Sequence, residues 1–169
     1  MIRYPMIVPG NHPAAQGVFG EEVYVETLVN GPTVGFALVH KEPWIDMPIS
    51  AFDKMPMAER LNPEYHYVGR LAGDRITLTD IMTRKGPLDH EAKFVEADRI
   101  GLECVQLLHA GALTDPQQIQ DFLTQAPDGI VVKPIKVSPQ QRLIYVEITP
   151  EMFGPQGDDA SCQTPSSAN

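Results

Sequence analysis

The fold is decided by the stretch Val23-Tyr24-Val25-Glu26-Thr27-Leu28-Val29-Asn30-Gly31-Pro32. Its first half alternates β-branched or apolar residues with polar ones, which predicts a strand over 22–28. Asn30-Gly31-Pro32 then favours a turn, because asparagine and glycine adopt positive φ at little cost. The β-rich run from Val34 to His40 is therefore expected to be the partner strand of a hairpin.

The size and composition of the chain predict one folded domain. It has 169 residues, of which 43% are hydrophobic, enough for a substantial core. Residues 151–169 are rich in Gly, Asp, Ser, Thr and Pro, a composition that cannot bury a core. We expect a domain over 1–150 and a disordered C-terminal tail over 151–169.

Charge and cysteine content restrict the class of function. The formal net charge is -9, so a nucleic acid would have to meet a local basic patch. Cys104 and Cys162 give neither a disulfide framework nor metal-ligand spacing. No window of the sequence approaches the ~18 apolar residues that cross a bilayer, and the first residues do not resemble a signal peptide. The expectation is a cytoplasmic protein that does not bind membranes.

The rest of the chain changes from hairpins to strand and helix units. Prolines and glycines predict irregular structure in the first twenty residues, and prolines predict a loop with at most a short helix over 42–62. The further expected elements are a hairpin of 65–72 and 75–82, helices over 88–100 and 115–124, and strands over 104–108, 129–132 and 143–148. This order predicts an α+β fold.

Four separated segments resemble motifs of ATP-dependent RNA ligases and related polynucleotide ligases, which are nucleotidyltransferases. Glu26 to Gly31 is similar to the family's Lys-x-Asp-Gly segment, and Val68-Gly69-Arg70-Leu71 to its Gly-Glu-Leu segment. Leu88 to Leu123 resembles the linker that follows. Asp128-Gly129-Ile130-Val131-Val132-Lys133 is close to Glu-Gly-hydrophobic-Val-hydrophobic-Lys. Together these segments cover about 20–136 in the order that the family uses.

The resemblance implies a ligase-type nucleotidyltransferase (adenylation) domain, with two antiparallel sheets forming a cleft and helices flanking them. It also implies ATP and Mg²⁺ as cofactors and a nucleotide or RNA end as partner. The residues that it assigns to nucleotide binding are Glu26, Leu28, Asn30, Gly31, Arg70, Asp128, Gly129 and Lys133, with Asp128 also implied as a metal ligand.

The departures from the family pattern fall on the catalytic positions. The nucleophilic lysine is replaced by Leu28, which has no amine to attack the α-phosphate. Asn30 stands where the family has aspartate and Arg70 where it has glutamate. The two lysines of the last motif correspond to Tyr145 and Glu147. The resemblance thus implies a fold that has lost self-adenylylation.

The same residues also fit purely structural roles. Asn30-Gly31 alone is typical of a tight turn, Asp128-Gly129 of a turn that enters a core strand, and Lys133 or Lys136 of a solvated strand end. The histidines lack zinc spacing, and no Gly-x-Ser-x-Gly elbow or phosphate loop is present.

Three hypotheses follow from the sequence. The main one is a ligase-like protein unable to self-adenylylate that binds a nucleotide or nucleic acid end. The second is an active RNA ligase that recruits another amine, Lys41 or Lys133. The third is a structural or protein-interaction module on this fold.

Overall fold

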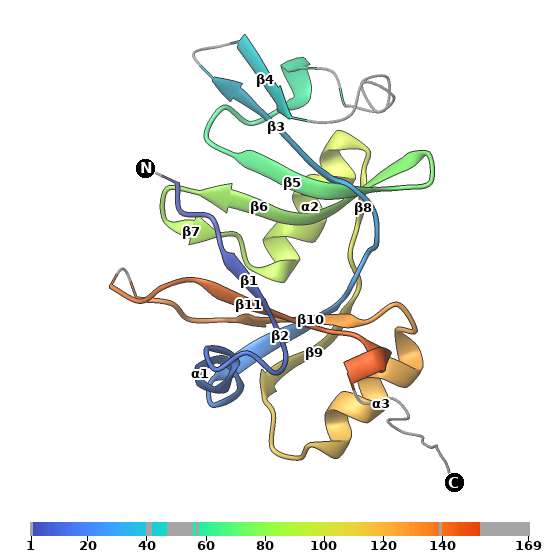
Figure 1. Ribbon diagram of the computed structural model, residues 1–169. Coiled ribbons are helices and arrows are strands. Elements are labelled where there is room, and N and C mark those ends of the chain that lie inside the picture. The colour runs from blue at the N-terminus through green and yellow to red at the C-terminus, as the bar shows by residue number, and fades with distance from the viewer. Residues whose placement is uncertain (1, 40–41, 47–55, 57, 139, 153–169) are drawn as a thin grey trace, which may run out of the picture. The chain divides into compact units, whose positions relative to one another are not determined.

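The computed structural model describes residues 2–39, 42–46, 56, 58–138 and 140–152 (Figure 1). The architecture is α+β, as predicted. The elements are β1 (Met6–Pro9), α1 (Ala15–Phe19), β2 (Glu22–Thr27), β3 (Thr33–Val39), β4 (Glu42–Asp46), η2 (Ala58–Arg60), β5 (His66–Ala72), β6 (Arg75–Thr83), β7 (Gly86–Pro87), α2 (His90–Ile100), β8 (Glu103–Cys104), β9 (Leu107–Ala112), α3 (Gln117–Gln125), β10 (Ile130–Pro134), β11 (Ile144–Ile148) and η3 (Pro150–Met152).

These elements form two compact units, and each unit is built from two separate segments of the chain. The first unit contains Met1–Tyr4 and Val29–Gln106, and the second contains Pro5–Leu28 and Leu107–Asn169. The chain therefore passes between the units within its N-terminal segment, directly after Leu28 and directly after Gln106. Each unit is built around its own sheet.

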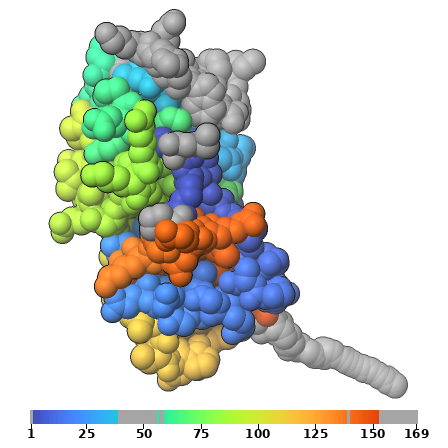
Figure 2. All heavy atoms as spheres, turned by 90° about the vertical axis from the view of Figure 1, so that its left-hand side faces the viewer, coloured from blue at the N-terminus to red at the C-terminus, as the bar shows by residue number. Residues whose placement is uncertain are grey.

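The sheet of the second unit has the strand order β1-β11-β10-β2-β9. Its pairs are antiparallel except for β1 and β11, which run parallel. In the space-filling view of Figure 2, the blue residues up to β2 and the orange residues of β10 and β11 lie side by side, although they are far apart in the sequence. This sheet is thus formed by pairing between strands that are distant in the sequence.

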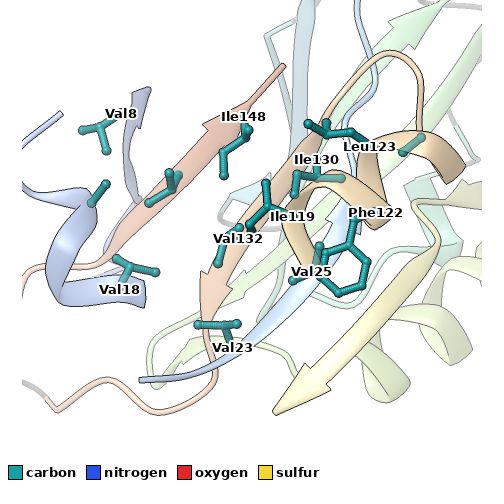
Figure 3. Close-up of a cluster of buried hydrophobic side chains, with 13 residues drawn as sticks. Val8, Val18, Val23, Val25, Ile119, Phe122, Leu123, Ile130, Val132 and Ile148 are labelled. Carbon is teal, nitrogen blue, oxygen red and sulfur yellow. The ribbon is translucent and has the colours of Figure 1, made fainter. Parts of the chain in front are cut away.

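One face of this sheet packs against α1 and α3. Val18 of α1 and Ile119, Phe122 and Leu123 of α3 are buried against the apolar side chains of β2, β10 and β11 (Figure 3). The strand residues in this core are Val23, Val25, Ile130, Val132, Val146 and Ile148. Because strand side chains alternate between faces, the residues between these positions lie on the opposite face.

The sheet of the first unit has the order β4-β3-β5-β6-β7, with β8 parallel to β6. The predicted hairpin around Gly73 is confirmed as β5 and β6. The helix predicted over 88–100 is confirmed as α2. Asp89 caps its N-terminus by accepting a hydrogen bond from the Ala92 backbone N–H, and Gly101 ends it in the left-handed conformation.

The predicted hairpin of 22–28 with 34–40 is wrong. β2 pairs with β9 and β10, whereas β3 pairs with β4 and β5. The Asn30-Gly31-Pro32 segment carries the chain from one sheet to the other. Gly31 has φ of 141°, and a Cβ at this position would overlap the carbonyl oxygen of Leu71. Local turn residues therefore indicated the bend but not the partner strand.

Other boundaries also differ from the expectations. The first twenty residues contain β1 and α1 rather than only irregular structure, and the expected loop over 42–62 contains β4. The expected strand over 104–108 is divided between β8 and β9, because the chain changes unit after Gln106. Of the expected disordered tail over 151–169, Glu151 and Met152 belong instead to η3, and 153–169 lie outside the described residues. Among those described, no helix has the length and apolar content that spanning a bilayer requires.

Candidate functional site

The candidate site residues of the second unit lie on the sheet face opposite its apolar core. In the antiparallel register, Glu26 of β2 is opposite Val131 of β10, and Val131 is opposite Glu147 of β11. Alternation along β10 and β11 places Lys133 and Tyr145 on this same face. We call Glu26, Val131, Lys133, Tyr145 and Glu147 the polar face.

An ion pair between β2 and β10 dominates the polar face. Lys133 Nζ lies 2.5 Å from Glu26 Oε1, and the side chains are only 7% and 1% exposed. The same ammonium lies 5.0 Å from the centroid of the Tyr145 ring, a cation–π contact. Each charge thus compensates the other in a buried setting, where removing one partner alone is costly.

Leu28 directly follows β2 and packs against the turn that precedes β10. Its backbone N–H donates to the Gly129 carbonyl at 3.0 Å, and the residue is only 9% exposed. Gly129 has φ of 124°, and a Cβ there would lie 2.9 Å from Leu28 Cδ2 and 2.7 Å from the Ile148 carbonyl oxygen. Only glycine fits this close approach. Position 28, where the resemblance predicts the nucleophile, is therefore filled by a buried aliphatic side chain.

Asp128, next to Gly129, is exposed. Its role as a metal ligand remains a prediction. Among the described residues, no three His, Cys, Asp or Glu side chains come together as a metal-binding group.

The remaining predicted site residues belong to the first unit. Arg70 Nη1 donates to the Gly31 carbonyl at 3.1 Å, and the Leu71 backbone N–H donates to the Pro32 carbonyl at 3.0 Å. Gly31 and Arg70 are therefore brought together where β5 meets the segment before β3, and Asn30 directly precedes Gly31 in the chain. Lys41, the other candidate amine, lies outside the described residues.

A hollow elsewhere on the second unit gathers basic side chains. It has a volume of about 250 Å³, and Lys136, Gln141, Arg142 and Glu21 are among its lining residues. Lys136 and Arg142 are both exposed. In a chain of net charge -9, two neighbouring cations beside one carboxylate make a locally basic surface.

Sequence reasoning missed the Glu26–Lys133–Tyr145 arrangement. Each of these residues was singled out separately, but their contact depends on the register between strands that are distant in the sequence. The available signal was a charged residue inside an apolar strand, at Glu26 in one segment and Lys133 in the other, since buried charges are generally paired.

Comparison with solved structures identifies the fold. No family model matches the sequence, and no curated protein matches it. A putative ATP-dependent DNA ligase from Aquifex aeolicus has a TM-score of 0.63 and 15% identity, covering 86% of this chain and 50% of the ligase. An archaeal ATP-dependent RNA ligase matches in two forms, with TM-scores of 0.63 and 0.62 and identities of 20% and 18%. Each match covers 87% of this chain and 48% of the ligase.

The architecture is thus similar to that of the solved ATP-dependent ligases. It consists of two mainly antiparallel sheets with few helices. The chain has a ligase-type nucleotidyltransferase fold, as the sequence motifs predicted. It spans about half the length of these solved ligases.

Proposed function

We propose that this chain is a nucleotidyltransferase-fold protein that binds a nucleotide or nucleic acid end without self-adenylylation. The observation that carries the proposal is Leu28, a buried leucine packed on Gly129 where the ligase motif has its lysine. A nucleophilic amine is required for the covalent lysyl-AMP intermediate. Leu28 has no amine, so its presence at this position supports a protein that binds its ligand without adenylyl transfer.

The state of Lys133 argues against its use as a substitute nucleophile. An attacking amine must be deprotonated and able to reach the α-phosphate. Lys133 is instead 5% exposed, and its ammonium is held by the Glu26 carboxylate and the Tyr145 ring. The active-ligase alternative therefore depends on Lys41.

The distribution of charge favours a nucleic acid end over free ATP. The polar face carries Glu26, Lys133 and Glu147, so its formal charge does not attract a triphosphate. The exposed pair Lys136 and Arg142, at the hollow described above, offers two cations to a phosphate backbone. We propose that a 5′-phosphorylated RNA end, rather than ATP with Mg²⁺, is the preferred ligand, and that the setting is cytoplasmic.

Binding is tested by thermal unfolding with ATP, GTP and a short 5′-phosphorylated RNA. A ligand that binds only the folded state raises the midpoint, and we expect RNA to raise it most. Replacing both Lys136 and Arg142 by alanine should reduce the RNA effect and its salt dependence. The matched control, Arg84→Ala with Lys85→Ala, removes the same charge from the exposed turn between β6 and β7 and should leave the effect intact.

A protein-interaction module is the second candidate, and the net charge of -9 favours it. If none of the three ligands at millimolar concentration moves the unfolding midpoint, the nucleotide-binding proposal fails and this candidate replaces it. An effect of RNA that is equal in both double variants would contradict the role assigned to Lys136 and Arg142.

A further inference from the structure

The second unit contains a larger cavity away from the polar face. It has a volume of about 460 Å³ and lies where the turn after β1, the end of α1, the start of α3 and the end of β11 meet. Its apolar wall includes Phe19, Leu113, Ile119 and Ile148, and polar groups stand at Asn11 and Asp115. Ile119 and Ile148 are buried, whereas Asn11 and Asp115 are exposed. The cavity is thus apolar at its base and polar at its mouth.

The backbone at Gly10 helps to form this space. A Cβ at Gly10 would lie 3.1 Å from Ile148 Cγ1 and 3.7 Å from Met152 Sδ. Any larger side chain would therefore crowd the wall formed by Ile148. The absence of a side chain at this turn keeps the base of the cavity open.

The size of the cavity indicates the size of its ligand. Small-molecule sites are typically pockets of about 300–1,000 Å³ with mainly apolar walls and a few polar groups. An apolar cavity of about 150 Å³ holds one benzene molecule, so a volume of about 460 Å³ accommodates a bicyclic body with a short substituent. A nucleotide, with its charged phosphates, does not match such walls.

The charge at the mouth indicates the polar end of the ligand. Among the described residues that line the cavity, Asp115 is the one that is ionisable. Its Oδ1 accepts a hydrogen bond from the Gln117 backbone N–H at 2.9 Å, which holds the carboxylate at the start of α3. A cationic group is attracted to this position and an anionic group is repelled. The net charge of the whole chain acts in the same direction.

We propose that this cavity is a binding site for a small cationic amphiphile, an apolar bicyclic molecule that carries a protonated amine. The apolar body occupies the space between Phe19, Leu113 and Ile119. The amine lies at the mouth beside Asp115. The site is separate from the polar face, and the proposal stands whether or not the chain binds nucleic acid.

The test uses three probes of one shape: 2-naphthylmethylamine, 2-naphthylmethanol and 2-naphthoate. Each is titrated into the protein while the ¹³C-labelled methyl groups of Ile119, Ile148 and Met152 are followed by NMR. We expect saturable shifts of these methyl signals, with the amine binding most tightly and the carboxylate least. The absence of saturable shifts with the amine, or equal binding of amine and carboxylate, would overturn the proposal.

Two variants examine the base and the mouth separately. Leu113→Phe fills part of the cavity and should weaken binding of both amine and alcohol. Asp115→Asn should weaken only the amine, by about two- to five-fold, the range of an exposed ion pair. Asp121→Asn removes the same charge from the exposed side of α3 and serves as the matched control. Amine affinity that is unchanged by Asp115→Asn, or lowered equally by Asp121→Asn, contradicts the site.

Discussion

Leucine and lysine have similar carbon skeletons near the backbone, but only lysine ends in a nucleophilic amine. At position 28 the leucine is buried against Gly129, and the proposed function rests on this difference. The resemblance to the ligase motifs implies that Asn30 and Arg70 stand at acidic positions of these motifs, and Tyr145 and Glu147 at lysine positions. The proposed loss of self-adenylylation therefore involves more than one residue.

The combined change of Leu28→Lys and Asn30→Asp tests how far the loss extends. We expect no AMP adduct with Mg²⁺ and ATP, because Tyr145 and Glu147 still supply no positive charge for the α-phosphate. The measurement is the intact mass of the double variant. An adduct of one AMP would show that the remaining motifs are sufficient and that the damage at Arg70 and in the last motif is overstated.

The Glu26–Lys133 pair makes a prediction about stability. Lys133→Met leaves the Glu26 carboxylate buried without this partner and should cost about 3–5 kcal/mol of unfolding free energy. Adding Glu26→Gln to it should recover most of the loss, since replacing a buried ion pair as a unit is often close to neutral. Chemical denaturation of the two variants measures both values. If the double variant lost more unfolding free energy than Lys133→Met alone, the pairing of Glu26 with Lys133 would be contradicted.

Gly31 and Gly73 form a matched pair for backbone strain. Both have positive φ, but a Cβ at Gly31 would overlap the Leu71 carbonyl, whereas one at Gly73 meets nothing within 4 Å. Gly73→Ala should therefore cost about 1–2 kcal/mol. Gly31→Ala should cost about 3 kcal/mol or more, because a steric clash adds to the strain. Equal losses in chemical denaturation would show that Gly31 is needed only for its φ.

At the scale of elements, turn and capping residues in the sequence predicted the β5–β6 hairpin and helix α2 correctly. The β5–β6 hairpin has a two-residue turn at Gly73-Asp74, and α2 has both of its capping residues, Asp89 and Gly101, in the sequence. The strand partners of β2 could not be predicted in this way. They lie in β9 and β10, and pairing over such sequence distances depends on tertiary packing rather than on turn residues.

A polar network attaches α2 to its sheet and gives a pH prediction. Tyr67 Oη donates to Glu96 Oε2 at 2.6 Å, and Arg99 Nη2 donates to the same oxygen at 2.6 Å. Burial acts to raise the pKa of Glu96, but the hydrogen bonds from Arg99 and Tyr67 hold this pKa below 4.5. The folded state therefore releases the Glu96 proton more readily than the unfolded state does.

The stabilisation from this network is fully present above pH 4.5 and is lost as the pH falls through the lower folded pKa of Glu96. Tyr67→Phe removes one hydrogen bond to the carboxylate, so it should reduce the loss of stability between neutral and acidic pH. Denaturation curves at several pH values measure this slope. An unchanged slope in Tyr67→Phe would contradict the role of the Tyr67 hydroxyl in lowering the pKa.

At the scale of the whole molecule, the sequence indicated the fold through motif order and spacing. The segments around Leu28, Arg70 and Gly129 occur in the order of the ligase motifs, and the structure has the fold of those ligases. The two interleaved units and the contact of Glu26 with Lys133 could not be predicted, because both depend on which distant segments pair. The fold therefore rests on the likeness to solved ligases, whereas the loss of the reactive amine is our proposal from Leu28.

The most direct test of this account is the intact mass of the unmodified protein after incubation with Mg²⁺ and ATP. We predict no increase by one AMP, because Leu28 cannot form the adduct and Lys133 is bound to Glu26. A mass increase of one AMP, mapped by peptide analysis to Lys41, Lys133 or another lysine, would contradict the account and identify an active ligase.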